Sequence, residues 1–341
     1  MKILVANNAA PFVRGGAELL ADRLVLELRR AGHEAELLRL PLGNTPEQIL
    51  SSLIAASLLD VVNVDRIIGL KFPAYLIPHR EVVIWLVHQF RQAYDLPPVG
   101  WPQDPTLDRV ASAVRAADRG AFADAKRLYA ISPMVAERLH RTNGMTAEVL
   151  MTPPHSEQVY RTAKAEDFIV AIGRISGGKR QLLAIQAMRH ARPGYRLVVA
   201  GPADNPGVLG QIEREMAEAG VGDRVELIPR FITEEEKLDL LARSIGSVYL
   251  PIDEDSYGYV CYEAAMSGKP SITATDSGGT LTLVEHGRTG LVSAPEPEAL
   301  AAVFDDLALH RDRARAMGRN ARALALELDL SWTRVIEELT R

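Results

Sequence analysis

The chain has 341 residues, of which 47% are hydrophobic and 24% charged, and its formal net charge at pH 7 is −5. This length is enough for two hydrophobic cores, and the composition is that of a globular protein rather than a disordered or fibrous one. No apolar run approaches the roughly 18–20 residues that would span a bilayer. The small negative charge gives no general attraction to nucleic acid, so we expect no nucleic-acid partner.

The first residues and the cysteine usage indicate the compartment. The sequence after Met1 continues directly into strand-like residues, without the basic segment, apolar run and cleavage site of a secretory signal. Cys261 is the single cysteine and stands in an apolar run. A buried, unreactive thiol in a reducing compartment is therefore predicted, and we expect a cytoplasmic protein.

One stretch of the sequence is locally basic. Its members are Arg115, Arg119, Lys126, Arg127, Arg138 and Arg141. A solvated helix face is the favoured interpretation. The alternative is peripheral contact with anionic lipid headgroups on the cytoplasmic face of the inner membrane.

In the first half of the chain, short apolar runs alternate with longer amphipathic segments, which is typical of α/β proteins. Strands are predicted at residues 2–6, 34–40, 60–64, 81–87 and 127–131, and helices at residues 17–31, 107–124 and 133–140. Ser132 and Pro133 suit the N-cap and the first position of the last of these helices.

A polar, proline-containing segment from Met151 to Asp167 is interpreted as an interdomain connection. After it, strands are predicted at residues 168–173, 195–201, 224–229, 246–251 and 270–274, helices at residues 179–189, 208–219, 234–243 and 259–267, and a nearly all-helical tail at residues 296–341. We expect an N-terminal Rossmann-like domain over residues 1–157 and a C-terminal one over residues 158–341. The last helix, at about residues 328–341, is a candidate to pack back on the first domain. Such domains bind ligands in the loops at the carboxyl ends of their strands, which predicts a shared cleft.

Two glycine-containing loops follow predicted strands. Gly15 and Gly16 precede the first helix, where backbone amides can approach an anion. Their spacing is not that of the GxGxxG fingerprint, and an ordinary turn is the favoured interpretation.

In the second of these loops, Gly173 ends a strand and Arg174 and Lys179 flank the turn before a helix. A forked guanidinium, a mobile ammonium and the amides of a flexible turn together suit a diphosphate. Arg180 is explained by a helical surface position.

The stretch from Asp255 to Glu263 is the most informative of the sequence. Asp255 is expected in a loop and Glu263 one turn inside the following helix, with Gly258 between them. Two carboxylates placed in this way can bind the hydroxyls of a sugar and of a ribose. Glu263 lies in the apolar run YVCYEAAM, and a buried acid needs a partner or a ligand.

Further polar residues surround this stretch. Gly278 and Gly279 follow the next predicted strand and offer another amide-lined loop. The run from Asp253 to Asp255 is acidic enough for Mg²⁺, but a solvated loop or hydrogen bonds to a ligand are favoured. His88 ends a predicted strand, and a structural role and a functional one are equally good interpretations.

These motifs resemble those of glycosyltransferase family 4, whose members are retaining enzymes of the GT-B fold. The resemblance covers nearly the whole chain and is densest over residues 168–292. Its elements are the loop Gly15–Glu18, the strand-end His88, the segment GRISGGK (Gly173–Lys179), the E-x7-E-like stretch from Asp255 to Glu263, and the segments GKPSITATDSGG and HGRTGLV.

The resemblance implies a role for each matching residue. Arg174 and Lys179 are expected to hold the diphosphate and to stabilise the leaving nucleotide. Glu263 is expected to bind the ribose, and the sugar is assigned to Asp255 and the amides around Tyr257, Gly258 and Tyr259. Gly15 and Gly16 are expected to close on the phosphates, and His88 to reach the sugar near the anomeric carbon. Family members use no metal and no other cofactor.

The sequence departs from the family pattern at Asp255, at Thr282, where the family commonly has an acid, and in a somewhat short first domain. Asp255 stands where the family usually has glutamate, so its carboxylate is one methylene shorter. Either the loop advances to compensate, or the neighbouring Glu254 takes the role.

The predicted function is retaining transfer of a sugar from a nucleotide-diphosphate sugar to a glycan, lipid-linked glycan or other small acceptor, in bacterial surface polysaccharide or glycolipid synthesis. The alternatives are an epimerase or phosphorylase of the same fold, and a non-catalytic module that binds sugar nucleotides. A phosphorylase that uses pyridoxal phosphate needs a buried lysine, and no lysine stands in a sufficiently apolar context.

Overall fold

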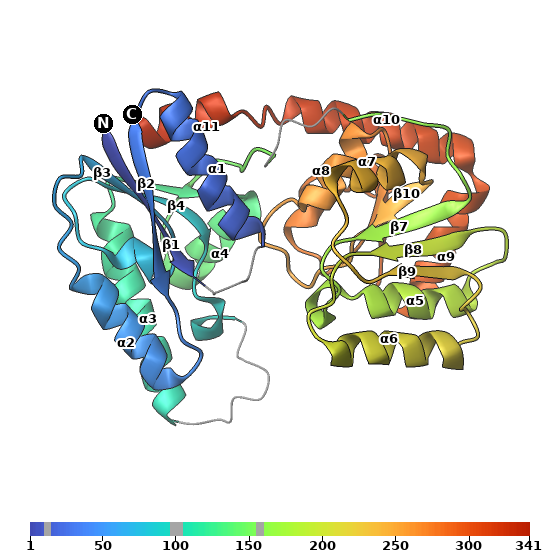
Figure 1. Ribbon diagram of the computed structural model, residues 1–341, viewed down its shortest axis with the longest axis horizontal. Coiled ribbons are helices and arrows are strands. Elements are labelled where there is room, and N and C mark those ends of the chain that lie inside the picture. The colour runs from blue at the N-terminus through green and yellow to red at the C-terminus, as the bar shows by residue number, and fades with distance from the viewer. Residues whose placement is uncertain (10–14, 96–104, 155–159) are drawn as a thin grey trace. The chain divides into compact units, whose positions relative to one another are not determined.

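The computed structural model describes residues 1–9, 15–95, 105–154 and 160–341. The chain divides into two compact units, one formed by Met1–Ser156 with Leu330–Arg341 and the other by Glu157–Asp329. Each unit contains one six-stranded parallel sheet with helices on both faces (Figure 1). The expected boundary between residues 157 and 158 lies outside the described residues.

In the first unit the strand order is β2-β1-β3-β4-β5-β6, and all neighbouring strands are parallel. Its elements are β1 (Lys2–Ala9), α1 (Gly16–Arg30), β2 (Glu34–Pro41), α2 (Pro46–Ser57), β3 (Arg66–Lys71), the 3₁₀ helix η1 (Ala74–Leu76), β4 (Val82–His88), the 3₁₀ helix η2 (Arg91–Ala93), α3 (Pro105–Asp124), β5 (Arg127–Ala130), α4 (Pro133–Asn143), β6 (Glu148–Val149) and α11 (Trp332–Thr340).

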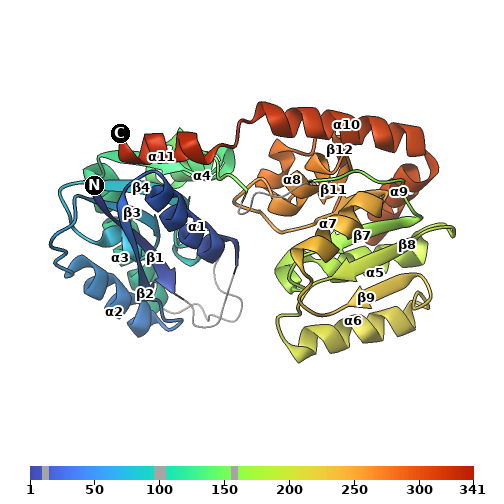
Figure 2. The ribbon, with the colours of Figure 1, turned by 45° about the horizontal axis from the view of Figure 1, so that its top comes forward.

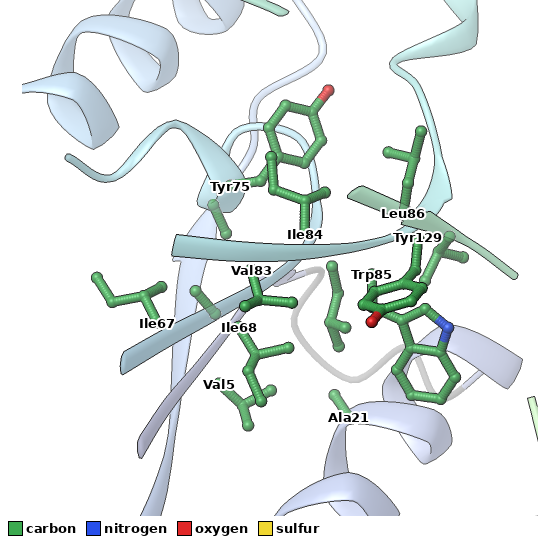
Figure 3. Close-up of a cluster of buried hydrophobic side chains, with 14 of the residues drawn as sticks. Val5, Ala21, Ile67, Ile68, Tyr75, Val83, Ile84, Trp85, Leu86 and Tyr129 are labelled. Carbon is green, nitrogen blue, oxygen red and sulfur yellow. The ribbon is translucent and has the colours of Figure 1, made fainter. Parts of the chain in front are cut away.

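Strand β4 shows how the first sheet is buried on both faces. Val83 and Trp85 lie on the face covered by α1, whereas Ile84 and Leu86 lie on the other face with Tyr75 (Figure 3). Successive side chains of a strand point to opposite faces, so a strand covered on both sides is apolar throughout. The apolar run of β4 therefore reflects its central place in the sheet.

The C-terminal helix α11 belongs to the first unit. It lies beside α1 in both ribbon views (Figures 1 and 2). Trp332 packs edge-on against Trp85 with ring centroids 6.3 Å apart and donates its indole N–H to the Pro154 carbonyl at 3.0 Å. The last residues of the chain thus complete a core whose other members come from its first half.

In the second unit the strand order is β12-β11-β10-β7-β8-β9, again all parallel. Its elements are β7 (Phe168–Ile172), the 3₁₀ helix η3 (Gly177–Lys179), α5 (Gln181–His190), β8 (Arg196–Ala200), α6 (Pro206–Glu218), β9 (Val225–Ile228), α7 (Glu234–Arg243), β10 (Gly246–Val248), α8 (Tyr259–Met266), β11 (Ser271–Ala274), the 3₁₀ helix η4 (Gly279–Thr282), β12 (Gly290–Ser293), α9 (Pro297–Leu309) and α10 (Arg311–Glu327).

Strand β7 is buried on both faces in the same way. Phe168 and Val170 pack in a cluster with residues of α7 and α8, while Ile169 and Ala171 pack in a second cluster with residues of α5 and α9. The helices α7 and α8 lie above the sheet in Figure 1 and α5 and α6 below it. Two layers of helices around a parallel sheet leave the strand ends as the place for polar loops.

Most predicted elements are confirmed, but the strand predicted at residues 60–64 is wrong. Asn63 has a φ of 61°, in the left-handed region, and Val62 is largely exposed. The strand begins at Arg66 instead, and the four residues after Arg66 are buried. The short strand β6 and the strand β12 were not predicted, and the helical tail is divided into α9, α10 and α11.

Two predictions about individual side chains have different outcomes. Cys261 is buried, as predicted, and burial raises the pKa of its thiol to about 12. The prediction of a solvated helix face is wrong for Arg138, whose side chain is 1% exposed and lies 3.1 Å from the Asp95 carboxylate.

No helix within the described ranges is both long and apolar enough to cross a membrane.

Candidate functional site

Three loops of the second unit emerge side by side at the carboxyl edge of its sheet. They follow β7 (residues 173–180), β10 (residues 249–258) and β11 (residues 275–278). These strands are consecutive neighbours in the sheet, in the order β11-β10-β7. Parallel strands end at one edge, and doubly wound sheets bind their ligands there.

Backbone hydrogen bonds join the three loops to one another. Ile252 donates its N–H to the Gly178 carbonyl at 2.9 Å, which ties the β10 loop to the β7 loop. Gly279, the first residue after the β11 loop, donates its N–H to the Glu254 carbonyl at 2.7 Å, which ties the end of that loop to the β10 loop. The loops therefore form one connected surface in which the position of each depends on the others.

The glycines of the β11 loop allow this close approach. Gly278 has a φ of +61°, and a Cβ there would lie 2.7 Å from the backbone nitrogen and oxygen of Glu254. A Cβ on Gly279 would lie 2.3 Å from the Ser256 carbonyl oxygen. Loop packing thus requires both glycines. The amide of Gly279 already has a backbone partner, whereas the sequence interpretation offered it to a ligand.

Lys179 lies at the centre of this surface. Its ammonium donates to the Tyr249 hydroxyl at 2.6 Å and pairs with the carboxylate of Glu254. The Tyr249 hydroxyl in turn donates to Glu254 at 2.7 Å. Burial raises the pKa of Tyr249 well above its usual value, and the negative charge of Glu254 raises it further. Tyr249 therefore remains a neutral donor between the two charged groups.

Arg174 lies at the start of the β7 loop, with a side chain that is 58% exposed. Its Nε is 3.3 Å from Asp204 Oδ1, in the loop after β8. Buried Gln181 braces the backbone here by donating to the Arg174 carbonyl at 3.0 Å. An ion pair this exposed adds at most about 1 kcal/mol to stability, so a bound anion can replace it at little cost. Gly173 just before it has a φ of +134°.

Glu263 lies in α8 and is 9% exposed. The sequence required a partner or a ligand for this acid, and Lys237 of α7 donates to its Oε1 at 2.7 Å. Burial raises the pKa of Glu263, and the positive charge of Lys237 opposes that rise. Glu234 also pairs with Lys237, at 2.9 Å. Glu263 is thus a buried acid with a cationic neighbour that the sequence did not reveal.

The remaining predicted residues of the second unit lie in the β10 loop and at the start of α8. Asp255 is partly buried on the β10 loop, and Gly258 is the N-cap of α8. The Tyr257 ring is fully buried and packs against Tyr259 with centroids 5.4 Å apart, so its side chain belongs to the core. Among the described residues, no three His, Cys, Asp or Glu side chains are grouped so that they could hold a metal ion.

In the first unit, Gly15 is the N-cap of α1 and Gly16 its first residue. The Gly15 N–H donates to the Glu18 carboxylate at 2.9 Å, so an acid of the same helix already binds this helix end. His88 closes β4, and its Nδ1 lies 2.5 Å from the Gln89 carbonyl oxygen. This contact assigns the proton to Nδ1 in the neutral ring.

Gln89, which follows His88, belongs to a buried polar cluster. Asp118 of α3 is fully buried and accepts hydrogen bonds from the Tyr75 hydroxyl at 2.9 Å and the Tyr94 hydroxyl at 2.8 Å. Asn143 donates to the Tyr94 hydroxyl at 3.0 Å and accepts from Gln89 at 2.5 Å. Burial raises the pKa of Asp118 to about 7, although the two hydroxyls oppose the rise.

Sequence reasoning missed several residues of the second unit that contact predicted site residues, among them Tyr249, Lys237 and Gln181. Tyr249 belongs to a predicted strand, and Lys237 to a predicted helix whose amphipathic pattern places lysine on the surface. Only the contacts identify them: Tyr249 lies 70 positions from Lys179, Lys237 lies 26 positions from Glu263, and Gln181 lies 7 positions from Arg174. Arg180 was misinterpreted as well, because its side chain is only 13% exposed.

The prediction that no lysine stands in a buried, apolar setting is wrong for Lys269. It is 5% exposed, donates to the Ala163 carbonyl at 3.2 Å, and burial lowers its pKa to about 8. Lys269 precedes β11, however, and therefore lies at the amino edge of the sheet. The three loops lie at the opposite edge, so Lys269 takes no part in their surface.

Residues 154–324, half of the chain, match the family described as glycosyl transferases group 1. The chain belongs to this family. The matched range contains all three loops, with Lys179, Glu254 and Glu263.

Solved structures share the fold of this chain. Anabaena HepE, solved with UDP and glucose, gives a TM-score of 0.75 at 18% identity, over 100% of this chain and 98% of that chain. Sucrose-phosphate synthase from Thermosynechococcus elongatus gives 0.81 at 16% identity over the same shares. At such identities the likeness shows the fold alone, and that fold is GT-B.

Curated relatives match a smaller part. A D-inositol 3-phosphate glycosyltransferase from Nocardia farcinica is 32% identical over 192 residues, which is 52% of this chain and 40% of that protein. A glycogen synthase from Mycobacterium tuberculosis is 29% identical over 192 residues, 53% of this chain and 43% of that protein. The match spans less than half the length of each of these two relatives.

Proposed function

We propose that the protein is a retaining glycosyltransferase of family 4. In this proposal it transfers a sugar from a nucleotide-diphosphate sugar to a hydroxyl of a glycan, a lipid-linked glycan or another small acceptor. The wider role is synthesis of a bacterial surface polysaccharide or glycolipid, in the cytoplasm or on the cytoplasmic face of the membrane. The proposal rests on the group 1 family and on the charges at the carboxyl edge of the second sheet.

The observation that carries the proposal is the position of Lys179. Its ammonium lies where three strand-end loops meet, and its present partners are one carboxylate and one hydroxyl. A diphosphate offers several charged acceptor oxygens that can take their place. We propose that the donor diphosphate binds here, and that the exposed guanidinium of Arg174 turns from Asp204 to the same phosphates.

These two cations fit the chemistry of the reaction. The bond between the anomeric carbon and the phosphate oxygen breaks, and its electron pair stays on the phosphate. Fixed positive charge at that place lowers the energy of the transition state more than that of the bound donor. The acceptor oxygen then bonds to the anomeric carbon from the same face, and its proton passes to the leaving phosphate oxygen.

The carboxylates take the hydroxyls of the donor in this proposal. Glu263 binds the ribose through Oε2, since its Oε1 is held by Lys237. For the sugar, Asp255 and Glu254 stay open as alternatives. The pairing of Glu254 with Lys179 favours Glu254 as the acid next to the phosphates and leaves Asp255 for the sugar. No metal is assigned to the reaction.

The roles proposed for Gly15, Gly16 and His88 stay predictions. For His88 the Nδ1 contact fixes the tautomer, so Nε2 is the ring atom that can accept a proton or a hydrogen bond. Substitution of His88 by alanine tests this role in an assay of sugar transfer.

The test is a screen of UDP-, GDP-, ADP- and dTDP-sugars by thermal shift and calorimetry. UDP-glucose is the first probe, because the HepE structure contains UDP and glucose. Inositol 3-phosphate and a short glucan are the first acceptors, because the named relatives point to them. Products are identified by mass, and the anomeric configuration by NMR.

The outcomes separate the alternatives. Donor binding with transfer and retention supports the proposal, whereas transfer with inversion overturns the retaining mechanism. Binding without release of a nucleotide identifies a sugar-nucleotide binding module. Conversion of the donor alone into another sugar identifies an epimerase, and phosphate-dependent cleavage of a glycan identifies a phosphorylase.

A further inference from the structure

Arg180 has a backbone conformation that its side chain alone does not favour. Its φ of 53° and ψ of 37° lie in the left-handed region, which glycine, asparagine and aspartate visit far more readily than other residues. Arg180 follows Lys179 directly and is the N-cap of α5. A strained residue of this kind persists only when its surroundings hold it in place.

The side chain of Arg180 provides that hold. Its Nε donates to the Leu250 carbonyl at 2.7 Å and its Nη2 to the Pro251 carbonyl at 3.0 Å, both at the start of the β10 loop. The two terminal nitrogens also pair with both oxygens of Asp276 in the β11 loop, at 2.8 and 2.6 Å. A fourth partner is the Ser277 hydroxyl, 3.4 Å from Nη2.

Arg180 therefore joins all three loops. Arg180 itself ends the β7 loop, its fork binds the β11 loop, and the two carbonyls belong to the β10 loop. These carbonyls lie just beyond the end of β10 (Gly246–Val248), where the ladder supplies no further donors. A planar, five-donor group can satisfy them and a carboxylate together, whereas an ammonium cannot reach all of them in one plane.

The bound segments continue directly into the residues of the proposed site. Pro251 lies three residues before Glu254, and Asp276 lies two residues before Gly278. Asp276 also accepts the Asp253 N–H through its backbone carbonyl, at 2.9 Å. A shift of the β10 loop would thus move Glu254 away from Lys179, the neighbour of Arg180.

We propose that Arg180 is a positioning residue of the donor site: its guanidinium locks the β7, β10 and β11 loops in the arrangement that places Lys179 beside Glu254. The inference rests on the proposed function. Arg180 itself is assigned no contact with the donor.

The test compares Arg180→Gly with Arg180→Lys. Glycine accepts the left-handed backbone without strain and removes the whole side chain, so the variant isolates the loss of the guanidinium. Lysine keeps the positive charge but lacks the fork. The control is Arg196→Ala, at the amino end of β8, which removes an arginine paired with Glu226 at 3.0 Å.

The first readout is hydrogen exchange of the loop amides, which requires no turnover. In Arg180→Gly the amides of Ile252, Asp253 and Gly279, which now bind across the loops, are expected to exchange at least 10-fold faster, while the strands keep their protection. Unchanged exchange of these amides overturns the proposal, whether or not the protein is a glycosyltransferase.

The second readout is transfer kinetics. We expect kcat/KM for the donor to fall about 100-fold in Arg180→Gly, as for a displaced catalytic group, and about 10-fold in Arg180→Lys. KM for the acceptor is expected to stay the same. Added methylguanidinium should restore part of the loss in Arg180→Gly, and none in the double variant Arg180→Gly with Asp276→Ala.

The two readouts distinguish the failures. Faster exchange with unchanged donor kinetics shows that Arg180 holds the loops without serving the reaction, and overturns its positioning role. A wild-type chain that transfers no sugar overturns the proposed function and the positioning role with it, while the exchange data still decide whether the lock exists. Equal loss in Arg196→Ala shows a general effect of charge and also overturns the proposal.

Discussion

The two units share one architecture but hold ionisable side chains in different settings. In the first unit, Asp118 lies inside the packing of helix against sheet, with two tyrosine hydroxyls as fixed partners. In the second, Lys179 and Arg174 lie on loops beyond the strand ends, with partners that are themselves partly exposed. Partners of the first kind serve stability and those of the second kind can be exchanged for a ligand. The same sheet can therefore carry a structural charge or a functional one.

Removal of the exchangeable cations is expected to have the largest effect. Lys179→Ala and Arg174→Ala should each lower donor kcat/KM by about 100- to 1,000-fold, since each removes one charge that stabilises the leaving phosphate. Unfolding temperatures should change little. The control is Lys126→Ala in the first unit, whose side chain is 57% exposed and lies 3.8 Å from Glu81. Full activity in either loop variant contradicts the assignment of the site.

Substitutions of Asp255 and Glu254, the two neighbouring acids of the β10 loop, are expected to differ in their effect on donor kinetics. Asp255→Asn should lower donor kcat/KM by about 10- to 100-fold if its carboxylate holds the sugar hydroxyls, because a charged acceptor is replaced by a neutral one. Glu254→Gln should lower donor kcat/KM less than Asp255→Asn does, because Lys179 loses its ion pair with Glu254 and then binds the phosphate more readily. Steady-state kinetics with one donor decide the question, and the reverse order assigns the sugar to Glu254.

Lys237→Met tests Glu263, the buried acid of the second unit. Donor kcat/KM at acidic pH is expected to fall about 10-fold. Burial raises the pKa of Glu263 and Lys237 opposes this, so the variant should keep Glu263 protonated to higher pH. The acidic limb of the donor kcat/KM profile should then move to higher pH. Glu234→Gln is the control, because it removes an exposed partner of Lys237. An unmoved limb shows that donor binding does not need the ionised acid.

The sequence was sufficient to predict most of the fold but only part of the site. Alternating apolar runs placed nearly all strands, because a doubly covered parallel strand is apolar throughout. Lys179 of the β7 loop and Glu263 of α8 were singled out by their motif spacing, and their roles stay predictions. Their partners Tyr249 and Lys237 were missed, since each contact joins elements that are distant in sequence. Arg180 was misread because helical periodicity cannot indicate a left-handed N-cap.

The last expected effect is on stability rather than on activity: the contribution of Asp118 changes by about 1 kcal/mol for each pH unit. Its pKa is raised from 3.8 to about 7 in the folded state. Between these values the folded chain binds one more proton than the unfolded chain, so the free energy of unfolding falls as pH rises. Above about pH 7 this contribution is constant.

Asp118→Asn cannot titrate, so the difference in unfolding free energy between the variant and the wild type should change with pH from 5 to 6 and level off above 7. Urea unfolding at each pH measures it. The test is the pH dependence of this difference, which a constant loss of stability in the variant does not change. The neighbouring Tyr75 and Tyr94 stay neutral in this range, because burial and the Asp118 charge raise their pKa values. A pH-independent difference would show that Asp118 is ionised in the core. The first unit would then hold its buried charge as the second does, and the contrast between them would lie only in the partners.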